Sequence, residues 1–146
     1  MAVDVTTEVL IHRPVTEVAA YAGEPTNAPQ WYANIRSVDC RTPPPLGPGS
    51  QIAFVATFLG RTLSYTYEVI DFVAGERLTM RTAEGPFPME TTYTWMPAGH
   101  DQTRMTLRNT GAPRGFAKIA PPLMASLMRR AMTKDLKALK GILEHR

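Results

Sequence analysis

The chain has 146 residues, of which 44% are hydrophobic and 20% are charged. This length predicts one domain spanning residues 1–146, and the composition excludes an intrinsically disordered protein. The formal net charge of +3 comes from 16 basic and 13 acidic residues, and no aromatic residues alternate with the basic ones, so we expect no nucleic-acid partner.

The first third of the chain predicts a strand, two short helical segments and a second strand. Residues 3–12 are rich in β-branched side chains and stop before Pro14, which suits the first turn of a helix. Residues 24–32 contain two prolines, so any helix in this segment is short or irregular. The second strand is expected over residues 35–42.

Five further strands are expected in the middle of the chain. Their connections are rich in glycine and proline, and they include an irregular loop over residues 43–49 and a tight hairpin at Gly60. Such short connections favour antiparallel pairing, because parallel strands need crossovers of about a dozen residues or more. The expected strands cover residues 50–59, 61–73, 76–83, 87–96 and 102–110.

The last third predicts one long amphipathic helix. Apolar residues, Phe116 among them, recur at spacings of three and four from residue 115 to residue 145, and a helix over residues 122–144 would be about 34 Å long. We expect three leucines to anchor this helix on the sheet: Leu136, Leu139 and Leu143. We expect four further residues to form an adaptable pocket wall: Met124, Leu127, Met128 and Met132.

The inward-facing positions of the strands mix aromatic and methionine side chains with hydroxyl and amide groups: Tyr65, Tyr67, Thr91, Tyr93 and Asn109. Buried hydroxyl groups need partners, and a fully packed core would use more leucine, isoleucine and valine. We therefore expect an apolar cavity between sheet and helix that offers a few polar groups to a ligand. The alternative is that the tyrosines bond to backbone at the rim of the sheet. Residues 52–58 are apolar on both sides, so their inward side stays open.

Several segments, in this order and spacing, resemble one known family: residues 11–18 (IHRPVTEV), 29–32 (PQWY), 46–50 (LGPGS), 67–72 (YEVIDF) and 75–78 (GERL). They resemble the START-like (SRPBCC) superfamily, in its polyketide cyclase/dehydrase and lipid transport branch. The resemblance implies an α+β helix-grip fold, in which a curved seven-stranded antiparallel sheet wraps a long C-terminal helix, with two short helices after the first strand. It also implies binding of lipids, polyketides, sterols or other apolar molecules, and some members are aromatases or cyclases.

The candidate ligand-binding residues come from the inner face of the sheet, the expected pocket mouth at the second short helix, and the C-terminal helix. They are Trp31, Tyr32, Phe54, Tyr65, Tyr67, Met80, Met89, Thr91, Tyr93, Leu107, Asn109, Met124, Leu127 and Met128. No catalytic residue can be assigned. His12, His100 and His145 lie at the ends of elements without a second ligand at a useful spacing, so no metal site is expected. Cys40 is expected to be a small core residue.

The leading hypothesis is noncovalent binding of an apolar small molecule, such as a lipid, a polyketide or an aromatic compound, without a cofactor. An alternative is a polyketide aromatase/cyclase or dehydratase that uses pocket tyrosines. Four arginines fall on the outer face of the sheet and Arg61 in a turn, which disfavours that chemistry: Arg77, Arg81, Arg104 and Arg108. A second alternative is a protein-interaction module that uses a basic cluster: Arg114, Lys118, Arg129, Arg130, Lys134, Lys137 and Lys140.

Three features bear on location. The single cysteine excludes an internal disulfide and fits a reducing compartment. The first five residues carry an acid where a signal peptide needs basic residues, and no stretch approaches the ~18 uncharged apolar residues of a membrane span. We therefore expect a cytoplasmic monomer or homodimer without stable membrane insertion.

Overall fold

The computed structural model describes residues 3–112 and 119–146. The strands are β1 (Val3–Ile11), β2 (Ile35–Cys40), β3 (Gln51–Phe58), β4 (Arg61–Val73), β5 (Arg77–Glu84), β6 (Met89–Pro97) and β7 (Thr103–Gly111). The helices are α1 (Val15–Ala22), the 3-10 turn η1 (Pro25–Asn27), α2 (Ala28–Trp31) and α3 (Pro121–Glu144).

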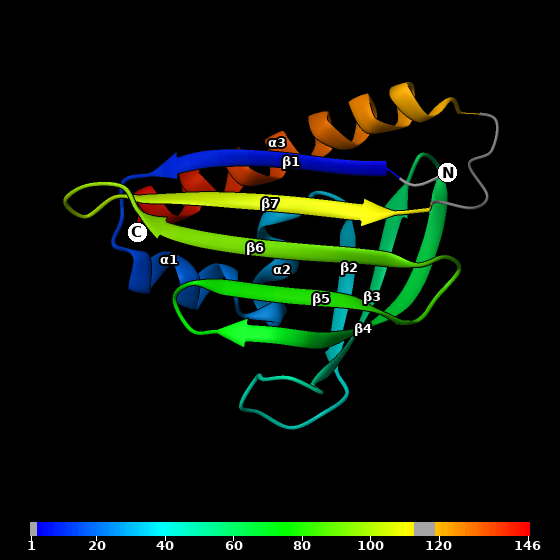
Figure 1. Ribbon diagram of the computed structural model, residues 1–146, viewed down its shortest axis with the longest axis horizontal. Coiled ribbons are helices and arrows are strands. Elements are labelled where there is room, and N and C mark those ends of the chain that lie inside the picture. Colours follow the sequence, from blue (N-terminus) through cyan, green and yellow to red (C-terminus); the bar gives the residue numbers. More distant parts are fainter. Residues whose placement is uncertain (1–2, 113–118) are drawn as a thin grey trace.

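The seven strands form one antiparallel sheet in the order β1-β7-β6-β5-β4-β3-β2. The sheet curls, and α3 crosses behind β1 while α1 and α2 lie on the same side of the sheet (Figure 1). This arrangement confirms the predicted fold, and most element bounds differ from the expected ones by one or two residues. No helix in the described part of the chain is long and apolar enough to cross a membrane.

The hairpin between β3 and β4 shows why its turn residues suit it. Leu59 and Gly60 both have positive φ, 49° and 79°, as a two-residue turn that matches the twist of its strands requires. Phe58 pairs directly with Arg61 across the turn. Arg61 is therefore the first residue of β4, which confirms the strand expected over residues 61–73, and its assignment to the turn is wrong.

The alternation of side chains along the strands separates a buried face from an exposed face. On β4, the side chains of Leu63, Tyr67 and Val69 are buried. On β5 and β7, the arginines predicted to face outward are exposed: Arg77, Arg81, Arg104 and Arg108. The sequence leaves open which side of residues 52–58 faces inward. Ile52, Phe54 and Ala56 are all buried, so their side is the inward one. The concave face of the sheet therefore carries the apolar wall.

The C-terminal half of α3 is fixed to this wall. Leu136, Leu139 and Leu143 are at most 1% exposed, which confirms them as the anchors of the helix. Arg13, two residues after the end of β1, donates hydrogen bonds to the main-chain oxygens of Leu143 and Arg146, at 2.9 and 2.6 Å. These carbonyls lie at the end of the helix, where no further turn supplies donors. The helix is thus held at its last turn.

The prediction that Cys40 is a core residue is wrong. Its side chain is exposed at the end of β2. The reason is that β2 is an edge strand of the sheet in which Ile35 is the only buried residue. A small apolar residue at the end of such a strand has no second layer to pack against.

Candidate functional site

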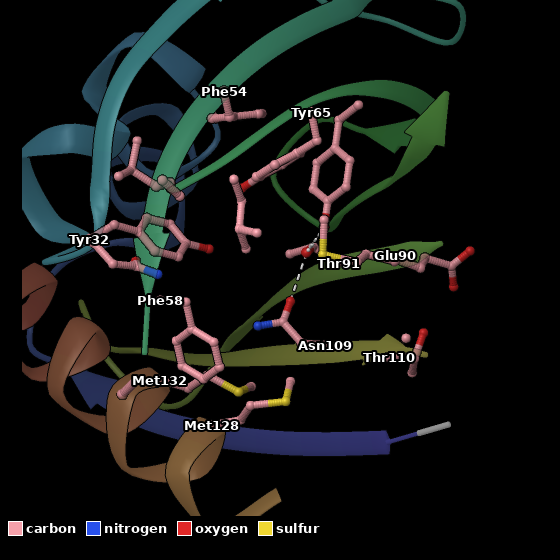
Figure 2. Close-up of a pocket in the computed structure, with 18 of the residues that line it drawn as sticks. Tyr32, Phe54, Phe58, Tyr65, Glu90, Thr91, Asn109, Thr110, Met128 and Met132 are labelled. Carbon is pink, nitrogen blue, oxygen red and sulfur yellow. Dashed lines mark hydrogen bonds between the residues drawn. The ribbon is translucent and has the colours of Figure 1, made fainter. Parts of the chain in front are cut away.

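A cavity of about 150 Å³ lies between the concave face of the sheet and α3. All seven strands and α3 contribute side chains to its lining. Figure 2 shows Phe54 and Tyr65 on one side of this space and Met128 and Met132 of α3 on the other. The cavity exists because the N-terminal half of α3 faces the curled strands with flexible methionines, whereas the leucines of its C-terminal half pack directly into the core.

Most of the predicted ligand-binding residues lie around this cavity. Those that line it are Tyr32, Phe54, Tyr65, Tyr67, Met80, Met89, Thr91, Tyr93, Asn109, Met124 and Met128. Met132, expected at the edge of the helical stripe, lines it too. Their contact with a ligand stays a prediction.

Three predicted residues do not line the cavity. Trp31 is 2% exposed and packs in the core, with its ring 4.2 Å from that of Tyr32, so it supports the cavity wall from behind instead of standing at a mouth. Leu107 is fully buried in the core beneath the wall. Leu127 is half-buried and points away, because one residue along a helix turns the side chain by about 100° from Met128.

Aromatic rings form a continuous part of the wall. The rings of Phe54 and Tyr65 stack with centroids 5.4 Å apart, and Tyr65 and Tyr67 lie 5.0 Å apart. Ring pairs at such distances are favourable by about 0.5–1.5 kcal/mol beyond their burial. These contacts fix the rings in place, so this side of the cavity is preformed.

A chain of hydrogen bonds crosses the sheet side of the cavity. The Thr91 hydroxyl donates to Asn109 Oδ1 at 2.6 Å, so the Tyr67 hydroxyl, 2.8 Å from Thr91, is the donor to Thr91. The Asn109 amide nitrogen is left facing the cavity, as Figure 2 shows. Burial raises the pKa of Tyr67 to about 12. This chain therefore presents an N–H donor to a ligand at neutral pH.

A second polar pair joins the end of α2 to β6. The hydroxyl groups of Tyr32 and Tyr93 are 2.7 Å apart, and burial raises the pKa of both phenols. Burial also raises the pKa of Tyr65 well above its usual value, and the Tyr65 hydroxyl has no hydrogen bond to another described residue. The cavity tyrosines thus stay protonated at neutral pH and serve as donors, not as bases.

One acidic residue in the cavity was missed by the sequence analysis. Asp135 of α3 is only 4% exposed, lines the cavity and accepts a hydrogen bond at Oδ1 from the backbone N–H of Ala33 at 3.0 Å. Burial raises the pKa of its carboxyl group from 3.8 to about 6. A sequence signal existed, because Asp135 follows Met132 by three residues and precedes Leu139 by four, which places it on the apolar stripe.

Other lining residues were also absent from the predicted set: Val3, Asn34, Ile35, Ala56, Phe58, Leu63, Phe87, Glu90, Thr110, Gly111 and Ala131. Most of them lie on a strand whose inward side the sequence left open, or at the ends of helices and strands. At such ends the alternation of apolar and polar residues does not indicate which way a side chain points. Glu90 and Thr110 lie at the half-exposed end of the cavity, and the Glu90 carboxylate points away from the aromatic rings (Figure 2).

Two arginines of the sheet form ion pairs on its outer face. Arg108 forms a two-pronged pair with Asp4 at 2.7 and 2.9 Å, and Arg77 pairs with Asp71. Within residues 3–112 and 119–146, no arginine, lysine or histidine lines the cavity, and no group of three or more histidine, cysteine or acidic side chains could hold a metal ion. The three histidines are all exposed.

The basic cluster on the opposite side of α3 is partly used within the fold. Arg129 donates to the Thr6 carbonyl at 2.8 Å and Lys140 to the Leu10 carbonyl at 2.7 Å, so both side chains tie the helix to β1. The other described members are exposed: Arg130, Lys134 and Lys137. Arg114, Phe116 and Lys118, which the sequence analysis placed in this cluster and in the helical stripe, lie outside the described residues.

Comparisons with known proteins agree with this architecture. The sequence profile of the family described as "polyketide cyclase / dehydrase and lipid transport" matches residues 2–144. No curated protein matches the sequence.

Solved structures share the fold at low sequence identity. A protein from Thermus thermophilus is 21% identical over 97% of both chains, with a TM-score of 0.82. A START superfamily protein from Mycobacterium smegmatis is 17% identical over 97% of both chains, with a TM-score of 0.84. The Zhui aromatase/cyclase from a Streptomyces species is 15% identical over 100% of this chain and 96% of that chain, with a TM-score of 0.80. These likenesses establish the START-type helix-grip fold.

Proposed function

The chain belongs to the polyketide cyclase/dehydrase and lipid transport family, and from this premise we propose that it binds an apolar, ring-containing small molecule in the cavity without covalent chemistry. The observation that carries the proposal is the composition of the cavity wall. Aromatic rings and methionines form most of the large apolar part of this wall, and a few oriented donors interrupt it. Small-molecule sites typically combine such an apolar lining with a small number of placed polar groups.

The size of the cavity limits the ligand. Its volume of about 150 Å³ is close to that of an engineered protein cavity that stays dry and binds benzene, also about 150 Å³. One aromatic ring therefore fits without rearrangement. The methionines on α3 are unbranched and flexible, so the wall they form can adapt to a larger group.

Three hydrogen-bond donors face this ring-sized space. They are the hydroxyl of Tyr65, the amide nitrogen of Asn109 and the paired hydroxyls of Tyr32 and Tyr93. A purely hydrocarbon ligand would leave these donors without acceptors, which costs free energy. The ligand that matches the wall is therefore an aromatic or polyketide-like compound that carries oxygen atoms.

Native mass spectrometry of the purified protein tests this proposal. The wild type should retain small aromatic compounds from a mixture. Replacing Ala131 by Phe places a ring in the cavity and should abolish retention. Replacing Ser126 by Phe, on the exposed side of the same helix, is the matched control and should leave retention unchanged. Equal retention by the wild type and Ala131→Phe would show that the compounds bind elsewhere.

A second candidate function is cyclisation or dehydration of a polyketide-like substrate. The observation that favours it is the buried Asp135 carboxyl, whose pKa of about 6 suits a general base, in the same cavity as four protonated phenols. The Zhui structure has the same fold and is an aromatase/cyclase by name. The absence of a cationic side chain from the described cavity lining weighs against this function, because it leaves a developing enolate with neutral donors only.

Turnover of a model poly-β-ketone separates the two functions. If the cavity is catalytic, replacing Tyr65, Tyr67 and Tyr93 by Phe should lower kcat by about 100-fold or more, as loss of aligned donors does, with a smaller effect on KM. If the protein only binds, the wild type will not accelerate cyclisation above the rate of the Ala131→Phe variant.

A further inference from the structure

The charge of the cavity lining is opposite to the charge of the chain. The whole chain carries a formal charge of +3, yet the two ionisable acids among the described lining residues, Asp135 and Glu90, face no lysine, arginine or histidine in that lining. The basic side chains of the described residues are exposed, apart from Arg13 and Lys140, which are half-buried. Asp135 is therefore the acid of the described lining that faces the interior, since the Glu90 carboxylate points away from the aromatic rings (Figure 2).

Asp135 is the buried acid of this lining. Its Oδ1 accepts the Ala33 N–H, whereas its Oδ2 is not among the fully buried unpartnered atoms of the described residues and has no hydrogen bond or ion pair with any of them. A carboxylate that is 4% exposed and half-satisfied is costly to keep. A fold that needed only packing at this position would be better served by a leucine, as at Leu139 one turn further along the helix.

Two tyrosines lie in the same cavity as the carboxyl group. Tyr32 and Tyr93 line the cavity together with Asp135, and the charge of Asp135 acts on both phenols. Rings arranged beside a carboxylate form an environment in which a cation gains both an ion pair and contacts with ring faces.

From the unpartnered Asp135 oxygen, the tyrosines that share its cavity and the lack of a cation in the described lining, we infer that the oxygen-bearing ligand is also an amine, aromatic or alicyclic, whose protonated nitrogen pairs with Asp135. This inference rests on the proposed function and specifies its ligand class. Carboxylates and phosphates, including fatty acids and phospholipid headgroups, are disfavoured, because no described lining residue would neutralise them.

The groups that face Asp135 set the pH dependence of this pairing. They are Tyr32 at the end of α2, Tyr93 on β6 and Lys134 on the exposed side of α3, and Tyr65 on β4 lines the same cavity. The three phenols keep their protons at neutral pH because burial raises their pKa values, and Lys134 stays in solvent. A primary amine also stays protonated, as lysine does. Asp135 is therefore the group whose ionisation changes between pH 5 and pH 7.

Three probes with the same ring test the inference: 2-phenylethylamine, 2-phenylethanol and phenylacetate, with a cationic, a neutral and an anionic head. Dissociation constants come from titrations followed by NMR at pH 7. The amine should bind about 10- to 100-fold more tightly than the alcohol, the range expected for a buried charge-assisted hydrogen bond. Phenylacetate should bind more weakly than either. Lowering the pH from 7 to 5 should weaken amine binding about tenfold, since the pKa of Asp135 is about 6.

Asp135→Asn is the matched variant, because the asparagine oxygen can still accept the Ala33 N–H. It should remove the preference for the amine and leave the affinity for 2-phenylethanol within about threefold. Glu84→Gln removes an exposed acid on β5 and should change neither affinity.

The outcomes separate this inference from the proposed function. If 2-phenylethanol or phenylacetate binds as tightly as the amine, and Asp135→Asn changes nothing, the inference is wrong while binding of a small molecule stands. If none of the three probes binds and no compound is retained in native mass spectrometry, the proposed function itself fails.

Discussion

Asp135→Asn should make the protein more stable at neutral pH. In the native state burial raises the pKa of this carboxyl from 3.8 to about 6, so the folded chain holds the proton more tightly than the unfolded chain. The stabilisation from that proton is fully present below about pH 4 and is lost as the pH rises through 6. Asparagine is neutral throughout, and its oxygen can keep the hydrogen bond from Ala33.

The magnitude follows from the difference between the two pKa values. A difference of about two corresponds to about 3 kcal/mol between low pH and pH 8. The wild type has already lost about half of this stabilisation at pH 5 and loses the other half between pH 5 and pH 8. The free energy of unfolding of Asp135→Asn relative to that of the wild type should therefore rise by about 1.4 kcal/mol from pH 5 to pH 8. This range is accessible without acid unfolding of most domains.

Urea unfolding at pH 5, 6, 7 and 8 measures this difference. The Glu84→Gln variant, which removes an exposed acid, should show no comparable trend. The reasoning is refuted if Asp135→Asn is less stable than the wild type at every pH, or if the difference between them does not change with pH. Either result would mean that the carboxylate is already compensated in the folded chain.

Three further predictions follow from the packing. Arg13→Ala removes two hydrogen bonds to carbonyls at the end of α3 and should lower the free energy of unfolding by about 1–3 kcal/mol without changing ligand affinity, as judged by urea unfolding and probe titration. Leu139→Ala, at a fully buried anchor, should lower the free energy of unfolding by about 2–5 kcal/mol. Met128→Ala in the cavity wall should lower it less and admit larger ligands. If thermal unfolding shows Met128→Ala to be the less stable variant, the division of α3 into anchors and wall is wrong. In an alkaline titration followed by ultraviolet absorbance, the four cavity tyrosines Tyr32, Tyr65, Tyr67 and Tyr93 should ionise only at a pH above that of a free phenol, because burial raises their pKa values. Ionisation of these four at the pH of a free phenol, without unfolding, would be inconsistent with a closed cavity.

The fold could be predicted because most local signals agree. The alternation along residues 61–73 fixes an inward side, Gly60 marks a hairpin turn, and the leucines of the C-terminal segment recur at helical spacing. Each of these signals is short-range, and each is confirmed by burial or by strand pairing.

The residues that line the cavity were only partly predictable. Whether an inward-facing residue borders the cavity depends on the curvature of the sheet and not only on the side of the strand that it faces. Leu107 and Tyr93 face the same way on paired positions of β7 and β6, yet only Tyr93 borders the open space. Trp31 precedes Tyr32 directly, and the turn of the chain at the end of α2 sends one ring into the core and the other to the cavity. No pattern within one segment contains that information.

Asp135 was missed for a different reason. An acid among lysines on an amphipathic helix is normally solvated, and Lys134 and Lys137 flank it in the sequence. Only the helical phase relative to Met132 and Leu139 places it on the buried side, and a charged residue is almost never fully buried without a partner. Residues that break a local rule in this way are where function is to be expected.

The methionines offer the most direct test of the central claim that an apolar ligand occupies the cavity. The cavity methionines are Met80, Met89, Met124, Met128 and Met132, while Met96 is exposed and Met105 is buried in the core elsewhere. In separate titrations of protein carrying 13C-labelled methionine methyls with 2-phenylethylamine and with 2-phenylethanol, we predict saturable shifts of the five cavity signals and none at Met96 or Met105. Shifts confined to Met96, or no saturable shift of any cavity methyl, would contradict the account.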